Sequence, residues 1–169
     1  MLKKLTVAAC MLSLAAGVAF AGAPAPKAAA MAGADKMAMM KAEMMKCSTC
    51  KHMAMHLDEL GPMTMDVAQL NDGVAIMHGV TNPAKAVAFH AACKETEAAG
   101  MASMSMTDDQ AKTDLCSMCQ DMRSAMKAGA KMSVGETTNG GIMVMTSSDP
   151  VVQKSLAGLA AKCAMMAKM

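Results

Sequence analysis

The sequence predicts an α+β protein in which two tandem helix-strand-strand-helix units form a four-stranded antiparallel sheet with the helices on one face. Three observations support this fold class. A Cys-Ser-Thr-Cys motif at 47–50 recurs 69 residues later as Cys-Ser-Met-Cys at 116–119. A lone cysteine follows each motif, at Cys93 and Cys163, and turn-forming residues recur in the same order between them. Periodicity of this kind indicates an internal duplication.

The first repeat covers residues 35–100 and is expected to form a helix, two strands and a second helix. These elements are predicted at residues 36–60, 63–70, 74–80 and 82–99. Gly61 is expected to end the first helix, because glycine readily adopts the positive φ of a helix C-terminus. The Asn-Asp-Gly turn at 71–73 has the residues that a tight hairpin requires. Asn82, followed by proline, is a good N-cap for the last helix.

The second repeat covers residues 107–169 and follows the same order. Its elements are predicted at 108–128, 132–138 and 142–146, with a last helix from residue 149 toward the C-terminus. Thr107 and Gln110 have the spacing of a capping box, and Gly129 is the expected helix stop. A chain of this length is expected to form one domain, so the two repeats should share a single core.

The N-terminus has the features of an export signal. Lys3 and Lys4 precede an apolar run at 5–20 that ends in a small-x-small pattern, so residues 1–21 are predicted to be a signal peptide. A lipoprotein signal ending at Cys10 is the alternative, but it would leave too short an apolar segment. Residues 22–34 are rich in Ala and Pro and are expected to be a flexible tether. The mature protein is therefore expected to be periplasmic or secreted.

The composition narrows the function further. The chain of 169 residues has 25 Met and 7 Cys, no Trp or Tyr, and two Phe. Without residues 1–21 it has 14 basic and 14 acidic side chains, so it lacks the basic excess of a nucleic-acid-binding protein. No apolar run after the signal reaches the ~20 residues of a membrane span, so no transmembrane segment is expected there.

The cysteines are expected to converge within each repeat. The two helices of a repeat should be antiparallel, with a shared base at the open end of the hairpin. Cys50 and Cys93 each lie 11 residues from that base, or about 16 Å at the rise of a helix. We therefore expect one pocket of three thiols in each repeat. The predicted metal ligands are six cysteines, one histidine and four methionines: Cys47, Cys50, Cys93, Cys116, Cys119, Cys163, His90, Met44, Met53, Met122 and Met166.

A three-thiol pocket favours Cu(I) as the bound ion. Thiolate and thioether sulfur select Cu(I), whereas Zn(II) takes four ligands and would need His90 or water as the fourth. The abundance of methionine points the same way, although zinc is possible. The predicted function is non-enzymatic: an exported protein that binds, stores or transfers Cu(I), with a metal-donor or metal-acceptor protein as a partner.

Other interpretations stay open. Disulfides between the cysteines would give a structural or adaptor domain in which methionine packs the core. A thiol-disulfide oxidoreductase is less favoured, because its reactive pair lies at a helix N-terminus and both motifs are expected inside helices. His52 and His56 lie on one helix face and are interpreted as a solvated pair, with a weak accessory metal site as the alternative.

Overall fold

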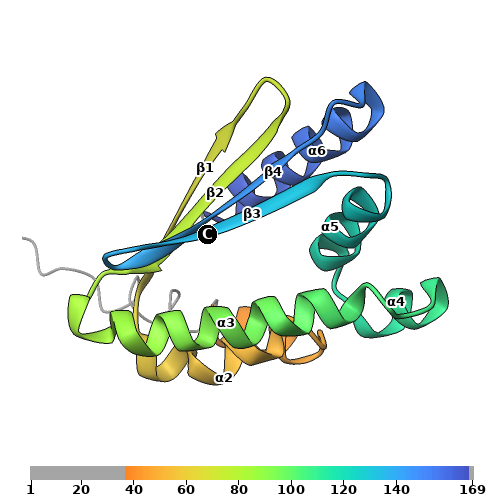
Figure 1. Ribbon diagram of the computed structural model, residues 1–169. Coiled ribbons are helices and arrows are strands. Elements are labelled where there is room, and N and C mark those ends of the chain that lie inside the picture. Colours follow the sequence, from red (N-terminus) through yellow and green to blue (C-terminus); the bar gives the residue numbers. More distant parts are fainter. Residues whose placement is uncertain (1–36, 168–169) are drawn as a thin grey trace, which may run out of the picture.

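A computed structural model describes residues 37–167 of the chain (Figure 1). A helical segment at 37–45 comes first. The elements that follow are α2 (Lys51–Leu60), β1 (Met63–Gln69), β2 (Gly73–Val80), the short 3-10 helix η1 (Pro83–Lys85), α3 (Ala86–Ser103), α4 (Asp108–Asp114), α5 (Ser117–Lys127), β3 (Lys131–Thr137), β4 (Gly140–Thr146) and α6 (Pro150–Met166). The predicted signal peptide at 1–21 and the tether at 22–34 lie outside the described residues.

The four strands form one antiparallel sheet in the order β1-β2-β4-β3. The second strand of each repeat lies in the middle, where β2 pairs with β4 and Ile76 faces Met143. The predicted α+β class and the duplicated hairpins are therefore confirmed. Because the two repeats join along β2 and β4, their matching positions lie on either side of this central pairing.

Two glycines allow β2 and β4 to pair along their whole length. A Cβ atom at Gly140 would lie 2.2 Å from the carbonyl oxygen of His78. A Cβ atom at Gly73 would lie 1.9 Å from the carbonyl oxygen of Met145. Both distances are shorter than any van der Waals contact, so each position requires glycine for the backbone to approach so closely.

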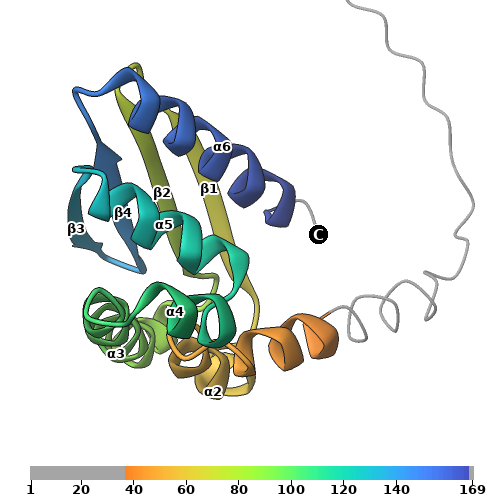
Figure 2. The same ribbon diagram turned by 90° about the vertical axis from the view of Figure 1, so that its right-hand side faces the viewer.

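One face of the sheet carries the core. Val74 and Ile76 of β2 pack against Leu156 and Leu159 of α6, while Val80 packs with Phe89 of α3. In Figure 2, α5 and α6 lie in front of the sheet, and α2 and α3 lie together below it. Helix α6 contacts β1 and β2, which belong to the first repeat, and α3 contacts β4 of the second. The last helix of each repeat thus packs on strands of the other.

The predicted helix caps are present. Thr107 and Gln110 form both hydrogen bonds of a capping box. The side chains of Asn82 and Asp149 accept hydrogen bonds from the backbone N–H groups two residues ahead, at 3.1 and 2.7 Å. Gly61 and Gly129 have φ of 72° and 98°, the conformation expected where a helix ends.

Both long helices that were predicted to contain the cysteine motifs are interrupted at the motif. The helical segment at 37–45 gives way to a turn at 46–50 before α2 begins. In the second repeat α4 ends at Asp114, and Leu115 and Cys116 adopt extended backbone conformations before α5. The prediction of continuous helices at 36–60 and 108–128 was wrong, because apolar periodicity does not reveal a change of direction between two helices of similar pattern.

No helix within residues 37–167 is both long enough and apolar enough to cross a bilayer.

Candidate metal centre

Four cysteines from the two repeats meet in one cluster. The sulfur atoms of Cys47, Cys50, Cys116 and Cys119 all lie within 4.8 Å of one another. The sulfur of Cys50 is 3.7 Å from that of Cys116 and 3.4 Å from that of Cys119. Across residues 37–167, no other set of three or more Cys, His, Asp or Glu side chains brings its ligand atoms as close together. The arrangement is close enough to bind a metal ion.

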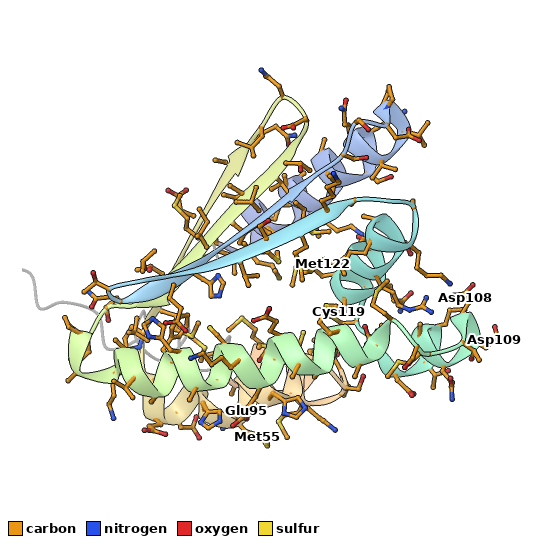
Figure 3. All side chains as sticks on the ribbon, viewed as in Figure 1. Met55, Glu95, Asp108, Asp109, Cys119 and Met122 are labelled. Atoms are coloured by element: carbon orange, nitrogen blue, oxygen red, sulfur yellow. The ribbon has the colours of Figure 1, made fainter. Side chains whose placement is uncertain are left out.

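All four thiols lie at or next to the two helix interruptions, which are the turn at 46–50 and the break between α4 and α5. Cys47 lies in the turn at 46–50, and Cys50 is the N-cap of α2. Cys116 is the N-cap of α5, and Cys119 lies in the first turn of that helix, where Figure 3 labels it. The positive end of a helix dipole therefore lies next to each motif, which favours the thiolate form of cysteine.

Backbone hydrogen bonds hold the turn at 46–50 in place. The N–H group of Cys50 donates to the sulfur of Cys47 at 3.5 Å. The N–H group of Ser48 donates to the carbonyl oxygen of Asp114 at 2.8 Å and so joins this turn to the end of α4. The hydroxyl groups of Ser48 and Thr49 are buried without a hydrogen-bond partner in the described part of the chain.

Apolar side chains cover one side of the cluster. Cys47 is almost fully buried and packs with Ala111 and Leu115, and Met106 lies against the same group. The other three cysteines are half-buried. Cys47 is therefore the sulfur best shielded from water, and the other three cysteines are more accessible.

The thiols of the cluster differ in acidity. Cys47 loses its proton first: while Cys116 is still protonated, hydrogen bonds from the Cys116 thiol and then from the Cys119 thiol lower the pKa of Cys47 far below its ordinary value. The pKa of Cys116 falls to about 6, first because the Cys119 thiol donates a hydrogen bond to it. The pKa values of Cys50 and Cys119 are raised, and the largest cause for each is its hydrogen bond to Cys116. Two sulfurs thus accept hydrogen bonds as thiolates, and the other two keep protons that a cation would displace.

The predicted three-thiol pockets are wrong. In the first repeat, the sulfur of Cys93 lies 3.6 Å from Nε2 of His78 and is absent from the four-sulfur cluster. Burial, followed by the negative charges of Glu136 and Glu97, raises the pKa of Cys93 to about 11. Cys93 lies one helical turn after Phe89 and packs in the same apolar cluster, which also contains Val80 of β2 and residues of α2.

Cys163 of the second repeat is also separate from the cluster. Its thiol contacts Sδ of Met118 at 3.4 Å and packs in the core beneath the sheet. It is 1% exposed, and burial raises its pKa. Burial therefore favours the protonated form of both lone cysteines, and their role as metal ligands stays a prediction.

The other predicted ligands occupy different places. His90 contacts the carbonyl oxygen of Gly140 through Nε2 at 3.0 Å. Met44 and Met53 pack in the apolar cluster that also contains Cys93, and Met122 packs against the cluster of Cys163. Met166 lies half-buried in the last turn of α6. None of these contacts tests metal binding, so their roles as ligands stay predictions.

Sequence reasoning identified all four clustered cysteines but grouped them incorrectly. The missed relationship is the meeting of the two motifs across the repeats. One signal was present, because serine follows the first cysteine of each motif. Serine favours turns and helix N-termini over helix interiors, since its hydroxyl competes for backbone hydrogen bonds.

Comparison of the chain with protein-family models, curated proteins and solved structures found no match.

Proposed function

We propose that this is an exported, non-enzymatic metal-binding protein that holds one ion among Cys47, Cys50, Cys116 and Cys119. The observation that carries the proposal is the convergence of four sulfur atoms from two repeats within 4.8 Å. Two ligands come from each repeat, so the ion would link the turn before α2 to the start of α5. The predicted signal peptide supports export to the periplasm or beyond.

Four thiolates favour Zn(II) at this centre. Sulfur atoms at about 2.3 Å from a tetrahedral ion lie about 3.8 Å apart. The separations of 3.4 and 3.7 Å around Cys50 need little adjustment to reach that value. The preference for Cu(I) rested partly on pockets of three thiols, and a fourth sulfur favours the tetrahedral divalent ion instead.

Cu(I) is the competing ion, and the surface methionines support it. Eight of the eleven exposed large hydrophobic side chains in residues 37–167 are methionines. Methionine usually packs in cores, whereas thioethers on a surface can collect or pass on a soft ion. A metal-donor or metal-acceptor protein would then exchange ions with the half-buried side of the cluster.

Metal content and stoichiometry test the proposal. Reduced protein is loaded with Zn(II) or with Cu(I), separated from free ion and measured by native mass spectrometry. We expect one Zn(II) per chain. When a chelator competes for the ion, the protein should retain Zn(II) more tightly than Cu(I). Tighter retention of Cu(I) would reassign the ion, and absence of both ions would refute the metal centre.

Cysteine variants then test which sulfurs bind. Cys116→Ser with Cys119→Ser should remove all of the bound ion, because the two repeats share one centre. The matched control, Cys93→Ser with Cys163→Ser, should keep it. If the first double variant retained half of the metal, each repeat would hold its own ion and the shared centre would be wrong.

A thiol-disulfide oxidoreductase is the second candidate. Its reactive cysteine pair lies at a helix N-terminus, and both motifs were expected inside helices. In the structure Cys50 and Cys116 are instead N-caps of helices, so this objection is removed. The pKa of Cys116, at about 6, suits a reactive thiol. Catalytic reduction or oxidation of a dithiol substrate by metal-free protein, lost in Cys116→Ser, would favour this function over metal binding.

A further inference from the structure

A second group of metal-binding side chains lies on the surface where α2 packs against α3. His52 and His56 lie one turn apart on α2, and Glu95 faces them from α3. Oxygen Oε2 of Glu95 is 3.9 Å from Nδ1 of His52 and 3.6 Å from Nε2 of His56. Figure 3 labels Glu95 in this region, together with Met55 of α2. Two imidazoles thus approach one carboxylate oxygen.

The two nitrogen–oxygen separations suit ligands of a single ion, although the three ligand atoms as a set are not as close together as the cysteine sulfurs. Ligand atoms at about 2.1 Å from an ion lie about 3.4 Å apart in a tetrahedron and farther apart when they are opposite each other. Each histidine side chain is 29% exposed and Glu95 is 51% exposed. Because these side chains are partly free to rotate, small movements would bring three ligand atoms around one point.

Glu59 lies near the other ring nitrogen of His56, beyond hydrogen-bond distance, and a small shift of either side chain would let it orient the ring. Its oxygen Oε2 is 3.9 Å from Nδ1 of His56, so the two ring nitrogens of His56 face two different carboxylates. A histidine that binds a metal through one nitrogen usually donates the other N–H group to a carboxylate, which fixes the ring. Such an arrangement leaves Nε2 of His56 directed toward Glu95 for the ion.

We propose that His52, His56 and Glu95 form a second metal site, open to solvent and suited to borderline divalent ions such as Ni(II) and Cu(II). Imidazole nitrogen and carboxylate oxygen favour these ions, whereas the four-thiol cluster is suited to Zn(II) or Cu(I). The two sites differ in ligand chemistry and share no residue. The proposal therefore does not depend on whether the cysteine cluster binds metal.

Paramagnetic Ni(II) is the probe. Full-length protein is first given one equivalent of Zn(II) to occupy the cysteine cluster, and Ni(II) is then titrated while amide signals are followed by NMR. We expect selective broadening of signals from residues near His52, His56 and Glu95. Broadening confined to residues around the cysteine motifs, or no selective broadening, would overturn the proposal.

Three variants test whether these residues bind a metal ion or form only a surface ion pair. His56→Gln and Glu95→Gln should each weaken Ni(II) binding at least tenfold, whereas Glu59→Gln should weaken it about tenfold through loss of ring orientation. The matched control is Glu97→Gln, an exposed carboxylate on the same helix, which should leave the affinity unchanged. Equal Ni(II) affinity in the wild type, His56→Gln and Glu95→Gln would show a structural ion pair only.

Discussion

The sulfur atoms of Cys50 and Cys119 lie 3.4 Å apart, although 69 residues separate them in the chain. These two cysteines are the last residues of the two repeated motifs, so the contact joins equivalent positions of the duplicated halves. Cys47 and Cys116, the first residues of the motifs, belong to the same cluster. The centre is therefore a product of how the repeats pair and not of either repeat alone.

Metal binding should stabilise the whole fold. An ion held by the native cluster but not by the unfolded chain adds about 2.7 kcal/mol to the free energy of unfolding at a free concentration 100 times its Kd. Thermal unfolding with and without Zn(II) measures this effect. Cys47→Ser with Cys50→Ser should unfold at the same temperature in both conditions. A Zn(II)-dependent shift that persisted in this variant would place the stabilising ion elsewhere.

The cysteines should fall into two classes of reactivity in the metal-free protein. Cys163 is buried and the pKa of Cys93 is raised to about 11, so both should react slowly with iodoacetamide near neutral pH. Cys116, which is half-buried and has its pKa lowered to about 6, should be modified first and should become protected when metal is added. Peptide mass spectrometry after timed alkylation gives the order. Fast modification of Cys163 in folded protein would contradict the core packing described above.

The central strand pairing should depend on glycine. Gly140→Ala places a Cβ atom 2.2 Å from a carbonyl oxygen of β2 and should lower the free energy of unfolding by about 1–3 kcal/mol or more. Gly158→Ala is the matched control, because a Cβ at this position in α6 meets nothing within 4 Å. It should raise stability by about 0.4–1 kcal/mol. Urea unfolding of both variants measures the contrast, and similar effects in the two would argue against the close approach of β2 and β4.

Asp108 should make stability depend on acid pH. Lys127 and then Arg123 lower the pKa of Asp108 from 3.8 to about 2. A carboxylate with a lowered pKa in the folded state contributes stability above its unfolded pKa, and this contribution is lost as the pH falls through the folded value. Unfolding measured from about pH 5 to about pH 2 should therefore show a steeper loss for the wild type than for Asp108→Asn. Glu136 also has a lowered pKa because of Lys94, but it titrates in both proteins, so the difference isolates Asp108. Parallel curves would contradict the ion pairs of Asp108.

The sequence was sufficient to predict the fold because its signals are local and repeated. Thr107, Asn82 and Asp149 begin helices for the same reason in any context: their side chains accept hydrogen bonds from free backbone N–H groups. Gly61 and Gly129 likewise mark positive φ. The order of helices and strands followed from these residues, and the antiparallel sheet followed from the two hairpins.

The site could be predicted only in part, because its geometry depends on two breaks that lack a strong local signal. Extending a regular helix through residues 46–50 placed Cys50 level with Cys93, whereas the turn instead directs it toward α5. A break of one or two residues redirects every side chain beyond it, so distances computed from an unbroken helix fail at that point. The pairing of the two repeats was also undetermined, since the sequence specifies strands but not which edges meet.

The symmetry of the ligands has an evolutionary consequence. Each half of the chain contributes the same pair of cysteines from the same place, next to the start of a helix. Two separate copies of a single ancestral half could therefore have assembled an equivalent centre as a homodimer before fusion. Once the halves were joined, the lone cysteines and the histidines no longer had to match, and the two halves were free to diverge around a shared cysteine cluster.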